Sequence, residues 1–521
     1  MSTVRSASAV SKRQPKAQVA AQTSVPQVLY WGAGFLSVPF LFGENVAIAC
    51  SIIAVGVLLT RLVWRTGEPQ LPLFICGYQW LQVFAPVVQA ELAGVSLEKF
   101  LGGPQFVTAT WLSLWAIGLF SASVGFSIRK MAPYRPGQIR RHDQNLSRLN
   151  QPLLVVAWVG ILLVDLMITR LKVPGITTFW NPIAYLRFGA AFMLFESVFA
   201  RKRGWGLVLL VTAVETAVGM LGFFSGFKVV FFLLILTSAS VLRRQKSAWV
   251  PFAAALLSLV FLGLVWQAIK GEYRDFASGG SLSQEMTVSV DDRIHYLQGA
   301  VERLDAYSFV VAFDSALMRL GYVTYFGHCL TQVPGHIPHT GGRLWGEAVS
   351  SVFMPRVFFP KKMVFHDSDR TNEFTGVRVA SNAEGASIGI GYVGESYIDF
   401  GVPGMFVPIA LFGLLIGGGY GWVIRETKPK EVGIAIGVGL LFSSGLLLES
   451  SNAKMLGAFV SALIVYWGLL SVQKRFFPRW GALMSGGNDS RRPSRIKGRR
   501  SKGASSRVIP LPTISIPADE V

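Results

Sequence analysis

The sequence predicts an all-α membrane protein: a polytopic helical bundle of about 12 spans that carries one large, partly helical loop. Only 15% of its 521 residues are charged, whereas soluble domains carry about 25%. Apolar runs of about 20 residues, the length that crosses the hydrocarbon core as a helix, recur along the chain. These runs are continuous rather than alternating, which predicts helices and not a β-barrel.

One long polar interruption, residues 269–401, divides the predicted spans into two groups. The spans before it are 28–43, 45–63, 70–95, 105–127, 151–169, 180–200, 205–223, 226–242 and 248–268. Those after it are 402–424, 431–449 and 455–473. Because Gly43, Glu44 and Asn45 form only a short break, a single kinked element is an alternative for the first two. The predicted regions are 1–27, a basic segment; 28–268, spans; 269–401, the long loop; 402–473, spans; and 474–521, a basic tail.

Lysine and arginine set the predicted orientation, because cytoplasmic loops of membrane proteins are enriched in them. Most of the 49 Lys and Arg residues lie in the N-terminal segment, in alternate short loops and in the tail. Both termini are therefore predicted to be cytoplasmic and disordered, and the long loop to lie outside the cytoplasm. The net charge of +20 follows from this distribution and suits anionic lipid headgroups, so nucleic-acid binding is not expected.

Two helical segments are predicted inside the long loop. Residues 291–307 alternate charged and apolar residues at helical spacing. Residues 308–330 are more apolar, but Asp314 and Arg319 in the middle make a membrane crossing costly. We expect this segment to form an amphipathic helix that lies on the outer membrane surface or packs on the bundle.

The sequence carries no sign of a metal or a cofactor. Its 3 cysteines make neither a disulfide framework nor a metal spacing. No Gly-rich nucleotide loop, nucleophile elbow or zinc-binding helix motif is present. His366-Asp367-Ser368-Asp369 contains an Asp-x-Asp pair of the kind that holds a metal in nucleotide-sugar transferases. This pair is predicted to lie outside the cytoplasm, away from sugar nucleotides.

A stiff cationic segment is predicted at 354–362. Two prolines flank an aromatic run, and the segment presents Arg356, Lys361 and Lys362 close to the membrane. Arg offers a bidentate fork and Lys a mobile point charge, both of which suit a phosphate or diphosphate. The alternative is interfacial anchoring, since Lys and aromatic residues also gather at headgroup level.

Two carboxylates precede the tenth predicted span. Glu395 and Asp399 are four residues apart, so a helix places both on one face. A carboxyl group against apolar neighbours has a raised pKa and can act as a general base. The alternative is that these groups only hydrogen-bond to loop backbone at the mouth of the helix.

One arginine interrupts an otherwise apolar stretch near 185–190. Arg187 is a functional-site hypothesis because charges inside a membrane are costly, and a snorkelling side chain is the alternative. Asp165, Glu196 and Glu215 also fall in predicted spans. We expect them to pair with Arg187 or to line a polar cavity.

These features together resemble the Wzy-type polymerases of bacterial O-antigen and exopolysaccharide. The resemblance rests on Pro355-Arg356 … Pro360-Lys361, on Gly394-Glu395-Ser396-Tyr397 … Phe400-Gly401, and on the span plan with its large late loop. The motifs cover about 185–190 and 340–402, and the topology covers most of the chain. The family often has Asn before the Phe-Gly pair, where this chain has Asp399, so the role of Asp399 stays open.

The resemblance implies a GT-C-like glycosyltransferase of the inner membrane that acts at its periplasmic face on undecaprenyl-diphosphate-linked oligosaccharides. It implies no metal or cofactor, and partners that include membrane lipids, a flippase and a chain-length regulator. The expected diphosphate-binding cations are Arg187, Arg356, Lys361 and Lys362, with Arg343, Arg370 and Arg378 in addition. The expected base is Glu395, with Asp399 or His336 in reserve. The candidates for stacking on sugars are Tyr392, Tyr397 and Trp345.

Two other functions remain as alternatives. An O-antigen ligase shares the lipid donor, the span number and the large outer loop. A lipid-linked oligosaccharide flippase is the alternative from another class, although a carrier has little use for so large an outer loop. The sequence does not distinguish O-antigen from capsule or secreted matrix as the product.

Overall fold

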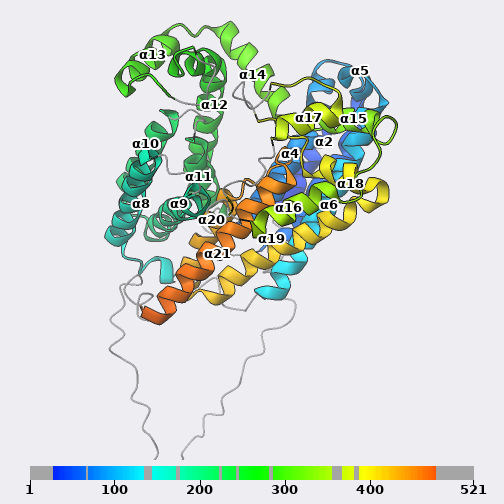
Figure 1. Cartoon of the computed structure of the whole chain (residues 1–521). Helices are drawn as coiled ribbons and strands as arrows, with labels where there is room; N and C mark the ends of the chain where they lie inside the picture. Colours follow the sequence, from blue (N-terminus) through cyan, green and yellow to red (C-terminus); the bar gives the residue numbers. More distant parts are fainter. Residues whose placement is uncertain are drawn as a thin grey trace, which may run out of the picture. The chain divides into compact units, whose positions relative to one another are not determined.

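A computed structural model describes residues 27–65, 68–133, 144–171, 176–221, 226–241, 246–280, 286–354, 359, 366–380 and 387–476. Every regular element in these residues is a helix, which confirms the all-α prediction (Figure 1). The basic N-terminal segment up to residue 26, the tail from residue 477, and the predicted cations Arg356, Lys361 and Lys362 lie outside the described residues.

Eight of the described helices are long and apolar enough to cross a membrane. They are α3 (Val46–Val63), α4 (Leu71–Leu92), α6 (Pro104–Met131), α8 (Gln151–Leu171), α9 (Ile176–Arg201), α12 (Trp249–Ala277), α19 (Phe406–Glu426) and α21 (Asn452–Phe476). Each of them coincides with a predicted span. Their length and composition would allow them to cross a membrane, which is compatible with the predicted membrane protein.

The other predicted spans form shorter helices. They are α2 (Gln27–Ser37) with the 3-10 helix η1 (Val38–Phe42), α10 (Trp205–Met220), α11 (Lys228–Val241) and α20 (Lys430–Ser443). The last three have 16, 14 and 14 residues, below the roughly 20 that cross the hydrocarbon core as a straight helix. Within the described residues, helix length and composition therefore support eight candidate spans, and the expected count of about 12 stays a prediction. Two small helices, α5 (Leu97–Leu101) and η2 (Lys246–Ala248), lie in connections.

Glycines let the helices of the bundle pack closely. Gly413, Gly417 and Gly421 lie four residues apart on α19, which packs along α6. A Cβ at Gly417 would stand 2.4 Å from the carbonyl oxygen of Val124 in α6. Small residues at this spacing bring helix backbones together where the lipid offers no hydrophobic driving force. These contacts fix one side of the framework that carries the polar helices of the long loop.

The long loop is largely helical, as predicted. Its helices are α13 (Val290–Glu302), α14 (Ala306–Leu320), α15 (Thr324–Gln332), α16 (Arg343–Phe353), α17 (Asp367–Thr375) and α18 (Tyr392–Gly404). Helix α12 extends to Ala277, past the predicted end of its span at 268, and α13 falls within the helix expected at 291–307. Helix α14 packs on α12 and α4, α15 on α6, α17 and α18, and α16 on α21 and α18. The loop helices therefore pack on the bundle.

The single helix expected at 308–330 is broken in the structure. Helices α14 and α15 meet at a bend of 46°, and together they qualify as a ninth candidate span. The break has a cause in α4. Pro86 has no N–H, so the carbonyl of Gln82 one turn earlier loses its helical donor. The Tyr322 N–H, between α14 and α15, donates to that Gln82 carbonyl at 3.1 Å.

Candidate functional site

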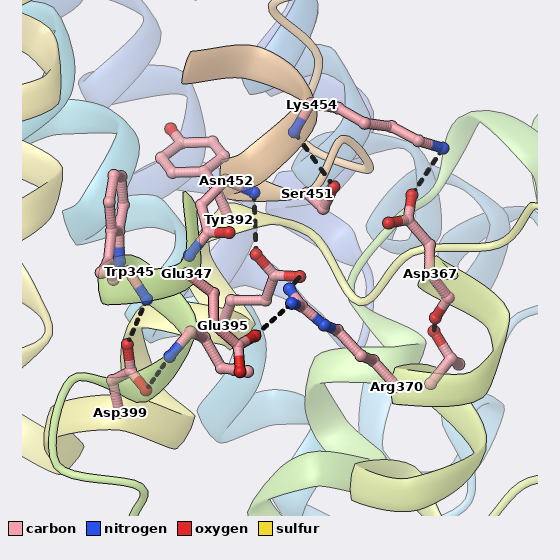
Figure 2. Close-up of polar contacts among 12 residues, drawn as sticks. Trp345, Glu347, Asp367, Arg370, Tyr392, Glu395, Asp399, Ser451, Asn452 and Lys454 are labelled. Atoms are coloured by element: carbon pink, nitrogen blue, oxygen red, sulfur yellow. Dashed lines mark hydrogen bonds and ion pairs between the residues drawn. The ribbon is translucent and has the colours of Figure 1, made fainter. Parts of the chain in front are cut away.

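The centre of the candidate site is the carboxyl group of Glu395, near the start of α18. Its side chain is only 1% exposed. One carboxylate oxygen, Oε2, accepts the backbone N–H of Asn452 at 2.7 Å, and the other, Oε1, lies 3.7 Å from Nη1 of Arg370. Glu395 itself lies on α18, and Figure 2 shows its two partners, Asn452 at the start of α21 and Arg370 on α17, directed toward it. Two helices of the long loop and the last described helix of the chain therefore meet at this group.

The start of α18 is held against the segment before α21. Gly391 has φ of 94°, a value that side-chain-bearing residues rarely adopt, and a Cβ there would stand 2.3 Å from the Leu448 carbonyl oxygen. The next residue, Tyr392, donates its N–H to the Ser450 carbonyl at 2.9 Å. Glycine is therefore needed at 391 to bring Glu395 within reach of Asn452.

Arg370 links three helices. Its guanidinium forms an ion pair with Glu347 of α16 and approaches Glu395 of α18. The Arg370 side chain is 9% exposed and Glu347 is 30% exposed, so solvent reaches one side of the triad. The guanidinium hydrogen-bonds to Glu347 and lies within ion-pair distance of Glu395, so it connects the helices that carry the two carboxylates.

The pKa of Glu395 is raised to about 8, chiefly because burial disfavours its charged form. The Asn452 N–H and the positive charge of Arg370 lower this pKa, while the negative charges of Asp367 and Asp399 raise it. The carboxyl group therefore exchanges its proton near neutral pH. A buried titrating acid with a fixed cationic partner is typical of functional sites.

A second ion pair flanks this centre. Nζ of Lys454 lies 2.6 Å from Oδ2 of Asp367 and donates to Ser387 Oγ at 2.8 Å. Asp367 belongs to the Asp-x-Asp pair considered above for a metal, and here it serves the ion pair. Among the described residues, no group of three His, Cys, Asp or Glu side chains is placed to hold a metal ion. The Lys454 side chain is about half exposed, so it places a cation at the rim of the site.

Asn452 places an amide beside Glu395. It begins α21, after Ser451, whose hydroxyl accepts the Lys454 N–H at 3.4 Å in the manner of an N-cap. The Asn452 side chain is fully buried, and neither its Nδ2 nor its Oδ1 has a hydrogen-bond partner within the described part of the chain. Leaving a buried donor or acceptor unpaired costs about 1–3 kcal/mol, so this amide suits a ligand hydroxyl.

Asp399 has a different environment from Glu395. Its Oδ1 accepts the Leu344 N–H at 3.0 Å and the Thr340 hydroxyl, and its Oδ2 accepts the Trp345 N–H at 2.8 Å. Backbone N–H groups in the first turn of a helix such as α16 have no acceptor within the helix itself. Asp399 is thus a helix cap supplied from another helix, and its carboxylate positions Glu347 through α16.

Replacing Asp399 by Ala is expected to lower the free energy of unfolding by about 0.5–2 kcal/mol, the cost of a lost cap. Asn is the matched control, because its amide oxygen still accepts an N–H from α16. Thermal or denaturant unfolding of the purified protein in detergent measures the difference. An Ala variant as stable as the Asn variant would contradict the capping role.

The predicted aromatic residues are mostly committed to packing. Tyr392 is fully buried and donates its hydroxyl to Gln79 Oε1 at 2.8 Å. Tyr397 is buried and donates to the Val333 carbonyl at 2.9 Å. Trp345 is half-buried, and its indole N–H donates to Ser396 Oγ at 3.0 Å. Of the three, only Trp345 keeps enough exposed surface to contact a sugar ring.

The remaining predicted residues are spread out. Arg343 is exposed and lies 3.5 Å from Glu373, and Arg378 and His336 are exposed. Arg187 lies in a separate cluster between α8, α9 and α10, where it pairs with Asp165 and approaches Glu215 at 3.4 Å. This is the pairing that the sequence analysis considered for these acids. The structure therefore joins Arg370 and Glu395 and leaves Arg187 with partners of its own.

Sequence analysis missed Glu347, Asn452 and Lys454. Glu347 lies on a helix of the long loop that had no predicted bounds, and the other two precede the last predicted span. The one available signal was the polar run Ser450-Ser451-Asn452 at the entrance to that span, which suits a helix N-cap.

A family model described as Domain of unknown function (DUF8712) matches residues 134–445. The chain belongs to this family. The matched region contains Glu347, Arg370 and Glu395, whereas Asn452 and Lys454 follow it. No significant match was found among curated proteins or solved structures.

Proposed function

We propose that the protein is a bacterial inner-membrane glycosyltransferase that polymerises undecaprenyl-diphosphate-linked repeat units into a surface or secreted polysaccharide. In this proposal the long loop is periplasmic and both termini are cytoplasmic. The main support is the Glu395 carboxyl group, buried between Arg370 and Asn452, with a pKa raised to about 8. The described residues of the same chain include eight candidate spans, which favours substrates carried by membrane lipids.

The proposed reaction needs one proton transfer and one bond exchange. The sugar hydroxyl of the acceptor gives its proton to the Glu395 carboxylate as its oxygen forms a bond to the anomeric carbon of the donor. The bond from that carbon to the diphosphate oxygen breaks, and the lipid diphosphate leaves with the electron pair. Glu395 then returns its proton to solvent. A base whose pKa lies near the working pH suits this step.

The neighbours of Glu395 have complementary tasks in this proposal. Arg370 holds the Glu395 carboxylate in place. Its positive charge favours the ionised form of Glu395, which is the form that accepts the proton of the hydroxyl. The Asn452 amide orients the acceptor hydroxyl, using the donor and acceptor that have no partner in the described structure. Lys454, at the rim, supplies a positive charge that stabilises the negative charge developing on the phosphate.

Replacing Asn452 by Leu is expected to separate stability from activity. Leu is similar in volume and removes two buried polar atoms without partners, so unfolding free energy should hold or rise by about 1 kcal/mol. Product formation should fall at least tenfold, because the acceptor hydroxyl loses its orienting group. Unfolding and single-turnover assays on the same preparation test both. A Leu variant that is less stable and fully active would contradict the assignment.

The function is tested with purified protein in nanodiscs and a lipid-linked oligosaccharide from the native locus. A ladder of longer lipid-linked products supports the proposal, and unchanged substrate overturns it. Analysis of the glycans from a deletion strain is an independent test of the function. Single repeat units attached to the acceptor indicate a lost polymerase, free polymer indicates a ligase, and repeat units held on the cytoplasmic leaflet indicate a flippase.

A further inference from the structure

Two buried glutamines lie on one face of α4, a helix long and apolar enough to cross a membrane. Gln79 is fully buried and Gln82 is 1% exposed. Because they are three residues apart in a helix, their side chains are neighbours on its surface. Buried amides in an apolar helix are costly unless they are hydrogen-bonded, so their partners show which parts of the fold they hold.

Gln79 connects the two segments that carry Glu395 and its backbone partner. Its Oε1 accepts the Tyr392 hydroxyl at 2.8 Å, and its Nε2 donates to the Leu446 carbonyl at 3.2 Å. Tyr392 lies three residues before Glu395 on α18, and Leu446 lies in the segment between α20 and α21 that leads to Asn452. One side chain of α4 is therefore bonded to both sides of the contact between Glu395 and Asn452.

Gln82 holds the same segment two residues further along the chain. Its Oε1 accepts the Leu448 N–H at 2.9 Å, and its Nε2 donates to the Glu449 carboxylate. Three residues after Glu449, the Asn452 N–H donates to Glu395. Because three residues of chain reach at most about 11 Å, Gln82 fixes the segment close to that contact.

Tyr322 ties the same part of α4 to the segment before α18. Its N–H donates to the Gln82 carbonyl at 3.1 Å, and its hydroxyl donates to the Gly389 carbonyl. A Cβ at Gly389 would stand 2.9 Å from the carbonyl oxygen of Glu449. The segments that precede α18 and α21 are therefore close together beside α4.

We propose that Gln79 and Gln82 are positioning residues, which hold the Asn452 N–H against the Glu395 carboxylate by fixing the segment before α21. The assignment deepens the proposed function, on which it rests only for the reaction that Glu395 carries out. Both glutamines act through Asn452, whose N–H favours the ionised form of Glu395. Loss of either amide should therefore raise the pH at which Glu395 releases its proton.

The titratable groups that interact with Glu395 come from α15, α17, α18 and the break between α14 and α15. They are Cys329, Asp367, Arg370, Asp399 and Tyr322. Glu347 of α16 and Lys454 of α21 pair with Arg370 and Asp367. Substitution of Gln79 changes none of these groups, and its own partners are uncharged, so Gln79 gives the cleaner test.

The test follows the Glu395 carboxyl group by difference infrared spectroscopy of the full-length protein in nanodiscs. The protonated carboxyl has a C=O band that the carboxylate lacks, and the loss of this band in Glu395→Gln identifies it. Gln79→Met keeps the length of the side chain and removes its amide. The midpoint of the titration should rise by about one pH unit, the effect of losing a hydrogen bond to a carboxylate. Gln82→Met should raise it as well, and unchanged midpoints in both variants would overturn the proposal.

Gln89→Met is the matched control on the same helix. Gln89 is also buried, and its Nε2 has no hydrogen-bond partner among the described residues. The same chemical change there should leave the midpoint at the wild-type value, and a shift equal to that of Gln79→Met would overturn the proposal. Tyr392→Phe removes only the hydroxyl that Gln79 accepts and should raise the midpoint by a smaller amount. If Gln79→Met does not fold, an unshifted midpoint in Tyr392→Phe overturns the proposal instead.

The infrared titration needs no substrate, so it separates the positioning role from the proposed function. A shifted midpoint in a protein that forms no polymer would reject the polymerase and leave the positioning role standing. Polymer formation with the same pH profile in the wild type and in Gln79→Met would reject the positioning role alone. A purely structural role predicts that Gln79→Met unfolds more easily while the midpoint of Glu395 stays in place.

Discussion

Glu395→Gln is expected to lower the rate of glycosyl transfer by about 10²–10⁴-fold, the usual contribution of a general base. The amide oxygen of Gln can still accept the Asn452 N–H, so the fold around α18 should be retained. Single-turnover rates at saturating lipid-linked substrate measure the effect. Asp399→Asn is the matched control, since the same chemical change at the cap of α16 should cost far less activity. Equal losses from the two variants would contradict the assignment of Glu395 as the base.

The pH dependence of the wild-type activity is a second test of Glu395 as the general base. A base works in its ionised form, so kcat/KM should rise with pH and level off above about 8, the raised pKa of Glu395. The rise should be absent from the residual activity of Glu395→Gln. A rate that instead falls through this range would mean that the protonated carboxyl acts as an acid.

As pH rises, the stability contributed by Glu395 should fall while the activity rises. The pKa of Glu395 is raised by burial from an ordinary value of 4.5 to about 8, so between these values the folded protein holds a proton that the unfolded chain releases. Stability from this group is therefore complete below about pH 4.5 and is lost as pH rises through 8. Glu395→Gln cannot ionise, so unfolding measured at pH 5 and pH 9 should show the variant gaining on the wild type at the higher pH.

Composition and run length were sufficient to predict the long apolar helices. The eight long helices of the described residues follow apolar runs that can be recognised locally in the sequence. The short α20 shows the limit of this reasoning. Its run was predicted to span from 431 to 449, yet its helix ends at Ser443 and has 14 residues. Hydrophobicity reports the cost of exposure to water and does not distinguish lipid from the interior of a bundle.

The candidate site was only half predictable for a related reason. The spacing of Glu395 and Asp399 places them on one face of α18, as expected, but their environments differ because different helices pack on each. Asp399 meets the first turn of α16, and Glu395 meets α17 and α21. The cation Arg370 could be named from sequence, whereas its partner Glu347 could not. Such pairings depend on tertiary packing, which no local pattern records.

Arg370→Met is expected to lower the free energy of unfolding by about 3–5 kcal/mol, because it leaves two carboxylates without the cation they share. The loss should be larger at pH 9 than at pH 6, since Glu395 can stay neutral at the lower pH. Arg343→Met is the matched control. Its pair with Glu373 is about half exposed, and such pairs contribute about 0–1 kcal/mol.

A double substitution tests whether the stability loss of Arg370→Met is caused by the carboxylates that it leaves without a cation. Arg370→Met combined with Glu347→Gln removes one of the two stranded carboxylates, so it should recover part of the stability that Arg370→Met loses. The recovery should be incomplete, because Glu395 remains buried and loses the cation that lowers its pKa. The activity profile of Arg370→Met should accordingly move to higher pH. A double variant less stable than the single one would show that Arg370 acts by packing its aliphatic stem between α16, α17 and α18, and not by its charge.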